Sequence, residues 1–221
     1  EKMINIPDTE LISNGFTPHK EYENFINQKD YEELLNTFPS DDIFEDELPE
    51  TRKHGQRPHQ RRFFCIGETQ GSQYFKRYLK KISDLPFVWQ TLLSIFHGKE
   101  YKEWICKTLN VNDFKIRFDF HRTRAGLDVS PHIDSIGKIG SHLFYFMPEE
   151  WQDDWGGKTI FYKDLNPFKL NPEPEEFKSN KVTDIRGNRS CLFKNSSEGW
   201  HGVTEVNAPI HRQVLNVVIL K

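Results

Sequence analysis

The sequence predicts an α+β domain in which helices come first and a β-sandwich or barrel follows. Apolar residues recur at helical spacing through the first half of the chain, and from Phe114 onward they alternate with polar residues as in strands. Clusters of Pro, Gly, Asn and Asp separate the short strand-like runs, notably over residues 166–175 and 195–199. With 221 residues, the chain suits a single domain, mainly helical over residues 1–113 and β-rich over residues 114–221.

Helical spacing predicts five helices before residue 114. Thr17 and Pro18 begin the first, because proline is favoured at the first helical position and Phe25 follows in phase. Asp30 and Glu33 resemble a capping box at the start of the second helix. The expected helices cover residues 17–26, 30–38, 74–82, 86–96 and 101–109.

A sharp reversal of charge separates the second and third of these helices. Acidic residues gather over residues 41–50, and basic residues follow from Arg52 to Arg62. The basic run is short and flanked by acid, and the formal net charge is only -3, so nucleic acid is not an expected partner. Two interpretations stay open for this segment: a solvated loop, or a basic lip that helps to dock a substrate.

Strands are expected from residue 114 onward. Over residues 114–121, Phe and Ile alternate with Lys, Arg, Asp and His, so that one face is apolar and the other polar. Further strand-like runs cover residues 141–147, 158–162, 190–193 and 213–220. These short strands are the material of the predicted sandwich or barrel.

The three cysteines indicate a reducing compartment. Cys65, Cys106 and Cys191 are odd in number and far apart, so they form neither a disulfide framework nor a zinc motif. Nothing in the chain resembles a signal peptide or an apolar run long enough to span a bilayer. A cytoplasmic protein without a membrane partner is therefore expected.

His132, Asp134 and His201 predict an open metal site. Asp134 follows His132 by two positions, so both side chains point the same way on an extended strand. His201 lies between Gly199 and Gly202, and glycines allow the backbone to approach a buried ion closely. Two imidazoles and one carboxylate can occupy one face of an octahedral metal and leave the other positions open, as in non-haem Fe(II) oxygenases.

Arg212 adds a second expectation, because it enters the apolar strand expected over residues 213–220. A guanidinium is costly to bury without an anion. Its planar fork binds carboxylates through two hydrogen bonds, so a dicarboxylate cosubstrate would be a natural partner. A simple surface salt bridge is the competing interpretation.

The second half of the chain resembles a known group of enzymes. It is similar to the prolyl-hydroxylase-like 2-oxoglutarate/Fe(II) dioxygenases, and particularly to the ribosomal prolyl hydroxylases. The resemblance covers about residues 114–221 and is fainter before that. It depends first on a His-x-Asp (His132 to Asp134), an aromatic strand (Phe144 to Phe146) and a Trp (Trp151). A Gly-Gly pair (Gly156-Gly157), a His-Gly-Val (His201 to Val203) and an Arg (Arg212) follow in that order.

The resemblance implies a double-stranded β-helix, or jelly-roll, with N-terminal helices packed on one sheet. His132, Asp134 and His201 would be the iron ligands and thus the catalytic centre, and Arg212 would bind the distal carboxylate of 2-oxoglutarate. His142 or Tyr145 could donate a further bond to that carboxylate, and the strand register decides which of the two faces inward. The implied cofactors are Fe(II), 2-oxoglutarate and O2, and ascorbate could serve as a reductant.

The sequence also departs from this group in two places. Hypoxia-sensing and collagen-type prolyl hydroxylases have a cosubstrate-binding Tyr about ten positions before the His-x-Asp, where this chain has Arg122. Val214 stands where some other branches of these oxygenases have the Ser of an Arg-x-Ser pair. Four residues are therefore candidate contacts of the substrate or cosubstrate: His121, Arg122, Arg124 and Asn216.

The expected reaction is hydroxylation of a C–H bond with release of succinate and CO2. A peptidyl prolyl residue is the substrate that the resemblance suggests, while a free amino acid, a sugar or another small molecule is the alternative. The segments 52–62 and 164–180 are candidate substrate contacts, with solvated loops as the other interpretation. A zinc hydrolase and a non-catalytic metal-binding jelly-roll module are the rival classes. The oligomeric state stays open.

Overall fold

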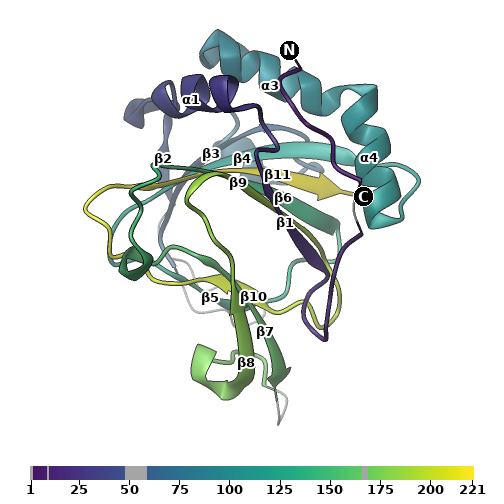
Figure 1. Cartoon of the computed structure of the whole chain (residues 1–221), viewed down its shortest axis with the longest axis vertical. Helices are drawn as coiled ribbons and strands as arrows, with labels where there is room; N and C mark the ends of the chain where they lie inside the picture. Colours follow the sequence, from purple (N-terminus) through teal and green to yellow (C-terminus); the bar gives the residue numbers. More distant parts are fainter. Residues whose placement is uncertain (1, 9, 48–58, 166–168) are drawn as a thin grey trace.

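Two antiparallel sheets face each other, and helices cover the outer face of the larger one (Figure 1). The computed structural model describes residues 2–8, 10–47, 59–165 and 169–221. The larger sheet has seven strands in the order β1-β9-β6-β11-β4-β3-β2, and the smaller has four in the order β5-β10-β7-β8. Within the described residues, no helix is long and apolar enough to cross a membrane.

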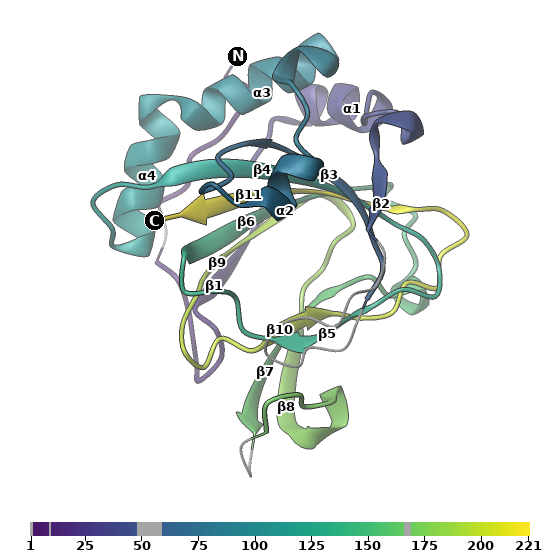
Figure 2. The same ribbon diagram turned by 180° about the vertical axis from the view of Figure 1, so that it is seen from behind.

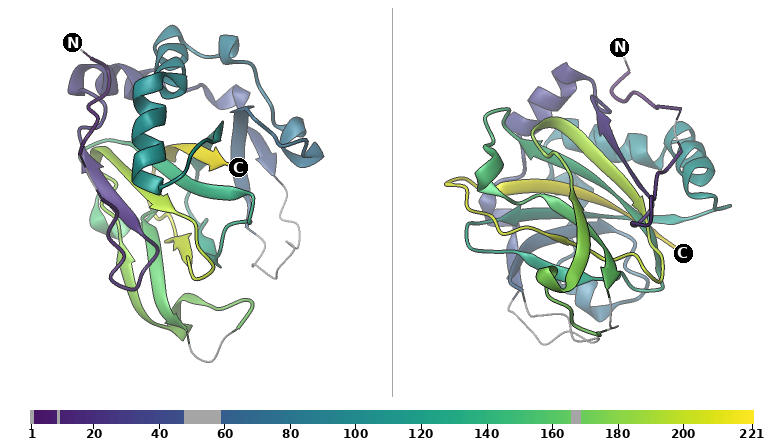
Figure 3. Two further views of the ribbon diagram at one scale, coloured as in Figure 1. Left: turned by 90° about the vertical axis from the view of Figure 1, so that its right-hand side faces the viewer. Right: turned by 60° about the horizontal axis from the view of Figure 1, so that its bottom comes forward.

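The strands from β4 to β11 pass back and forth between the two sheets, with β7 and β8 consecutive in the smaller one. In chain order, their bounds are Lys115–Thr123, Val129–His132, Lys138–Met147, Thr159–Leu165, Phe177–Val182, Gly187–Lys194, His201–Val203 and Arg212–Leu220. Strands β4, β6, β9 and β11 lie in the larger sheet, where β11 pairs with β4 on one side and β6 on the other. This winding is a double-stranded β-helix, which confirms the predicted fold class. Figure 3 shows its two layers from the side and from below.

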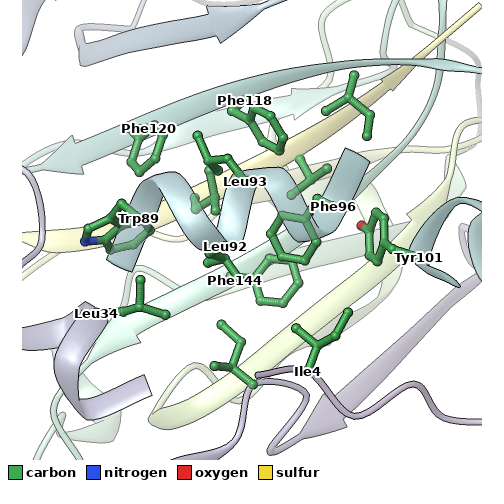
Figure 4. Close-up of a cluster of buried hydrophobic side chains, with 14 of the residues drawn as sticks. Ile4, Leu34, Trp89, Leu92, Leu93, Phe96, Tyr101, Phe118, Phe120 and Phe144 are labelled. Atoms are coloured by element: carbon green, nitrogen blue, oxygen red, sulfur yellow. The ribbon is translucent and has the colours of Figure 1, made fainter. Parts of the chain in front are cut away.

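Four α-helices, α1 to α4, accompany the larger sheet. Their bounds are Gln28–Asn36, Gln73–Arg77, Phe87–His97 and Lys99–Leu109. Helix α3 places Trp89, Leu92 and Phe96 on the aromatic outer face of the sheet, where Phe118, Phe120 and Phe144 meet them (Figure 4). These side chains are almost completely buried, so burial of apolar area fixes the helical layer to the sheet.

The helices expected over residues 86–96 and 101–109 are present, and two other expectations change. Helix α1 begins earlier than the capping box suggested, because the Asn27 side chain accepts a hydrogen bond from the Asp30 backbone N–H and caps the helix. The helix expected over residues 74–82 is only the short α2. It lies beside β3 and β4 (Figure 2).

The helix expected over residues 17–26 is wrong. This segment forms strand β1, His19–Glu23, which pairs along β9 and adds an edge to the larger sheet. Phe25 follows the strand and still reaches the helical core, which explains why its spacing resembled a helix. Pairing of the backbone with an exposed sheet edge outweighs the local helical pattern.

Strands β2, β3 and β8 were also not expected from the sequence, and the short strands β5 and β10 were not among the expected runs. Strand β2, Glu45–Glu47, lies in the segment expected to be a charged loop, and β3, Arg61–Gly67, begins at its end. Strand β8 begins at Phe177, inside the loop expected over residues 164–180. The first part of the chain thus contributes three strands to the larger sheet in addition to its helices.

Strand β6 shows which side chains face the interior between the two sheets. Phe144 and Phe146 join the core beneath the helices, whereas Tyr145 and Met147 join the cluster between the sheets. Val214, paired with Tyr145, belongs to the same inner cluster. Because alternate residues of a strand share a face, this assignment decides which predicted site residues point inward.

Candidate active site

The three predicted metal ligands meet at the end of the smaller sheet. His132 ends β5 and His201 begins β10, and these two residues are direct partners in the antiparallel pairing. Asp134 follows two residues after His132, in the loop that leads to β6. The fold thus brings together side chains that are 69 residues apart in the chain.

The ligand atoms are close enough to share one ion. The candidate atoms of His132, Asp134 and His201 all lie within 4.8 Å of one another. Nε2 of His132 is 3.9 Å from Oδ1 of Asp134, and Nε2 of His201 is 3.5 Å from Oδ2. Within the described parts of the chain, this is the one cluster of its kind. Two nitrogens and one carboxylate oxygen are a suitable set for a divalent transition metal.

Backbone carbonyls select the histidine tautomer that a metal needs. Nδ1 of His132 lies 3.0 Å from the Ser130 carbonyl oxygen, and Nδ1 of His201 lies 2.8 Å from that of Gly199. Each Nδ1–H can therefore donate to a carbonyl while Nε2 keeps its lone pair. Burial, reinforced by His201, lowers the pKa of His132 to about 3, and burial also lowers the pKa of His201. Both imidazoles are neutral near pH 7, as ligation requires.

Lys138 was not singled out by the sequence, yet it contacts the ligand set. Its Nζ lies 2.7 Å from Oδ2 of Asp134. Burial opposes ionisation of Asp134, but Lys138 and the two histidines outweigh it and hold the pKa of this carboxyl below its usual value. A lysine four residues after the aspartate is the only sequence signal, and it is a weak one.

Arg212 begins β11 on the interior face of the larger sheet. Its side chain is 5% exposed, and no carboxylate pairs with it among the described residues. Nε donates a hydrogen bond to the Gly157 carbonyl oxygen, which leaves the rest of the guanidinium without a protein anion. Burial lowers the pKa of Arg212 to about 10, so it is still charged near pH 7. The alternative of a surface salt bridge is wrong.

The Gly156-Gly157 pair makes room for this arginine. Gly157 has a φ of +70°, and a Cβ there would lie 2.9 Å from Cδ of Arg212. Gly156 also has a positive φ, and a Cβ there would overlap the Glu205 carbonyl oxygen. A side chain at either position would therefore bring both backbone strain and a close contact, with Arg212 at Gly157 and with the Glu205 backbone at Gly156.

Tyr145 lies on the same interior face as Arg212. The guanidinium carbon of Arg212 is 5.9 Å from the centre of its ring. The Tyr145 hydroxyl lies 2.8 Å from Oγ1 of Thr159 on β7 and 3.5 Å from Oγ1 of Thr183. These two threonines have no sequence signal until the register of β6 is known. A cation and three hydroxyls thus converge between the sheets, which suits a carboxylate.

His142 faces away from this interior, which contradicts its predicted role in binding the cosubstrate. It lies one residue out of phase with Tyr145 and is fully buried beneath the helices. Its Nδ1 is 3.0 Å from the Tyr101 hydroxyl and its Nε2 is 3.1 Å from Oγ of Ser190. Burial lowers the pKa of His142 well below its usual value. This histidine is a hydrogen-bonded member of the core.

Three of the four remaining candidates divide between the two faces of the larger sheet, and Arg124 lies beyond it. His121 and Asn216 share the interior face, because His121 pairs with Val214 and Asn216 is two positions from Val214. Arg122 points to the opposite face, where it pairs with Asp41 at 3.0 Å and lies over the ring of Phe44. The predicted contact of Arg122 with the site is therefore wrong. Arg124 is exposed beyond the end of β4.

The two predicted substrate-binding segments are only partly described. Arg52, Lys53 and Arg57 lie outside the described residues, as do residues 166–168. Of the basic run, Arg61 pairs with Glu47 and Tyr74, and Arg62 pairs with Asp41. These paired arginines form part of the sheet, so they are not free to dock an anion.

Comparisons with known proteins agree with this geometry. Residues 118–219 match the model of the 2OG-Fe(II) oxygenase superfamily. A search of curated proteins gave no significant match. Among solved structures, the chain is similar to a prolyl-4-hydroxylase of Pseudomonas putida, with a TM-score of 0.58 and 14% identity over 93% of each chain.

Two further solved structures share the fold. One is a prolyl hydroxylase of Trichoplax adhaerens in complex with a fragment of the hypoxia inducible factor, with a TM-score of 0.55, 18% identity, and coverage of 94% of this chain and 84% of that one. The other is a prolyl 4-hydroxylase of Phytophthora capsici, with a TM-score of 0.56, 15% identity, and coverage of 91% and 58%. At these identities the likeness establishes the fold alone.

Proposed function

We propose that this chain, whose residues 118–219 form a 2OG-Fe(II) oxygenase domain, is a hydroxylase of a peptidyl prolyl residue. Fe(II), 2-oxoglutarate and O2 are the cofactors of this domain. The observation that carries the proposal is a His-Asp-His cluster sharing one interior with a buried arginine that no carboxylate neutralises among the described residues.

The residues have separate tasks in this proposal. His132, Asp134 and His201 would hold the iron, which supplies oxidation of a C–H bond when it is loaded with 2-oxoglutarate and O2. Arg212 would bind the distal carboxylate of 2-oxoglutarate, since a dianion compensates its buried charge. Tyr145 would donate to the same carboxylate, because burial raises the pKa of its hydroxyl and keeps the proton in place.

His121 is the best placed of the tentative contacts. It faces the interior, stacks on Phe63 with ring centres 5.7 Å apart, and has no hydrogen-bond partner among the residues described. Burial lowers its pKa to about 3, although Asp119 opposes this, so the ring is neutral and can donate or accept one bond. We propose that His121, one of the four candidates from the sequence, contacts the cosubstrate or the substrate.

The half-buried Tyr74 of α2 supports a peptidyl prolyl substrate, because it offers an aromatic side chain near His121. It packs on the buried Phe63, which His121 also contacts. Proline-rich segments bind against aromatic side chains because their backbone is already ordered. The resemblance to the ribosomal prolyl hydroxylases points the same way. A free amino acid or another small molecule is the second candidate.

The two rival classes explain less of the interior. A zinc hydrolase could use the same three ligands, but it gives no task to Arg212 or to the hydroxyls around it. A non-catalytic module with a structural metal would gain nothing from a buried, uncompensated guanidinium. The three free cysteines support a reducing, cytoplasmic location for the enzyme.

Anaerobic titration tests the reaction class. Fe(II) is added to the purified protein, and 2-oxoglutarate is added next, while visible absorbance is recorded. We expect a charge-transfer band that needs both additions, and we expect none in His132→Ala. Absence of the band from the wild-type protein, or its persistence in the variant, would contradict the proposal.

A second experiment tests the substrate. Proline-containing peptides, free proline and other small metabolites are screened for stimulation of succinate release, and mass spectrometry then detects a gain of one oxygen. We expect stimulation by peptides, with the oxygen on a prolyl residue. Stimulation by small molecules alone would show that the substrate is not peptidyl and leave the reaction class intact.

A further inference from the structure

Lys138 is the only cation that is paired with a metal-ligand residue in the described part of the chain. Its side chain is 12% exposed, and Nζ lies 2.7 Å from Oδ2 of Asp134. The resemblance to known enzymes assigned no role to this residue. A nearly buried ammonium group is costly unless a carboxylate compensates it, and Asp134 is that carboxylate.

The protein holds this lysine firmly in place. Its backbone N–H donates to the Ser135 carbonyl oxygen, and its own carbonyl accepts a hydrogen bond from Nδ2 of Asn195. Lys138 also pairs with Leu220 at the end of β11, and its Nζ lies 5.6 Å from the centre of the Phe193 ring. Two backbone hydrogen bonds and the strand pairing thus fix the backbone of Lys138, from which the ammonium group reaches Asp134 and the Phe193 ring.

The two oxygens of Asp134 have different surroundings. Oδ2 lies 2.7 Å from Nζ of Lys138 and 3.5 Å from Nε2 of His201, whereas Oδ1 is 3.9 Å from Nε2 of His132. A carboxylate can bind a metal through one oxygen or through both. Three protein ligands leave three of six positions for a chelating cosubstrate and O2, and a carboxylate that used both oxygens would take one of these.

We propose that Lys138 is a positioning residue that keeps Asp134 a one-oxygen ligand. By engaging Oδ2, it leaves Oδ1 to the metal and keeps the third open position free. This inference rests on the proposed function, because it presumes a metal on His132, Asp134 and His201. Lys138 acts through Asp134, so its effect must be visible before any cosubstrate is present.

Cobalt(II) alone is the appropriate probe, since its visible spectrum responds to the number and arrangement of its ligands. The apo-protein is titrated with Co(II) in the absence of 2-oxoglutarate, and both the Kd and the spectrum are recorded for the wild type, Lys138→Met and Lys138→Arg. Methionine keeps the apolar stem against Phe193, and arginine keeps a cation that can reach Asp134. Lys169→Met is the control, because Lys169 forms an exposed ion pair with Glu176.

We expect Lys138→Met to raise the Kd for Co(II) about tenfold or more, as for other groups that orient a metal ligand, and to change the spectrum. Lys138→Arg should restore most of the wild-type behaviour, and Lys169→Met should not differ from the wild type. Circular dichroism confirms that each variant is folded.

Three outcomes separate the possibilities. If Lys138→Met keeps both the wild-type Kd and the wild-type spectrum, the positioning role is refuted. If it keeps both but weakens binding of 2-oxoglutarate, Lys138 contacts the cosubstrate instead, and the proposal is again refuted. If the wild-type protein itself fails to bind Co(II), the proposed function fails first.

Discussion

Replacing Arg212 with methionine should stabilise the unliganded protein and remove its response to 2-oxoglutarate. The guanidinium is 5% exposed, and among the described residues no carboxylate neutralises it. Methionine fills a similar space without a charge and adapts to irregular gaps. The same side chain would thus oppose folding and favour cosubstrate binding, which gives the substitution two effects of opposite sign.

The size of the effect follows from the pKa of Arg212. Burial lowers it from 12.5 to about 10, and each pH unit of difference corresponds to about 1.4 kcal/mol, or about 3 kcal/mol in total. Since the folded-state pKa is the lower one, this cost is complete near pH 7 and declines only as the pH rises through about 10. The substitution also removes the hydrogen bond to Gly157, which lowers the stability of the variant by about 1 to 2 kcal/mol. The net stabilisation is about 1 to 2 kcal/mol, which raises Tm by about 2 to 8 °C.

Thermal unfolding followed by circular dichroism measures both effects. Each protein is heated alone, with Mn(II), and with Mn(II) and 2-oxoglutarate at about 100 times its wild-type Kd, which should add about 2.7 kcal/mol to the wild type. Arg212→Met should gain stability from Mn(II) only. Arg186→Met is the control, because Arg186 forms a half-exposed pair with Asp184. A variant that is less stable alone and still responds fully to 2-oxoglutarate would refute the reasoning.

Three further predictions concern neighbouring residues. Gly157→Ala should raise the Kd for 2-oxoglutarate, measured by calorimetry with Mn(II) present, because its Cβ would lie 2.9 Å from Cδ of Arg212. Gly126→Ala is the control, since Gly126 has a similar positive φ but no atom nearby. An equal change of Kd in the two variants would contradict this reasoning. Burial lowers the pKa of His121 to about 3, so this group destabilises the fold as pH falls below about 6.5, by up to about 2 kcal/mol at pH 5. Urea unfolding at pH 7 and pH 5 measures this effect. The free energy of unfolding should fall less between these pH values in His121→Asn than in the wild type, and an equal fall in both proteins would show that His121 is not its source. His142→Leu should lower the free energy of unfolding by about 1 to 3 kcal/mol, since it leaves Tyr101 and Ser190 without their bonds; it should not change the Kd for 2-oxoglutarate, and a weaker Kd would restore His142 to the site.

The sequence predicts the fold class and the β-rich half of the chain well, because alternation is explicit there. Strand β4 follows the pattern read over residues 114–121 closely. Strand β1 was missed because its apolar residues serve two neighbours, β9 and the helical core. Strand β3 was missed because its charged residues are satisfied by partners such as Glu47 that only the folded chain brings near. Neither arrangement leaves a local signal.

The candidate site, too, could be predicted from the sequence only in part. His132, Asp134, His201 and Arg212 could be predicted because their chemical types are unusual in their positions. The choice between His142 and Tyr145 could not, because a single step of register exchanges the two faces of β6. The same one-residue step separates His121 from Arg122 on β4. Thr159 becomes visible only when the two sheets are placed face to face, and the spacing of four residues from Asp134 is too weak a signal to single out Lys138.

The pairing of His132 with His201 also bears on how long the protein survives. Strands β5 and β10 have only four and three residues, so few backbone hydrogen bonds join them. A metal held by both histidines would act as a removable cross-link between segments that are 69 residues apart in the chain. Loss of the ion would then loosen the smaller sheet and expose it to proteases. We expect the cellular half-life of this protein to follow the supply of iron.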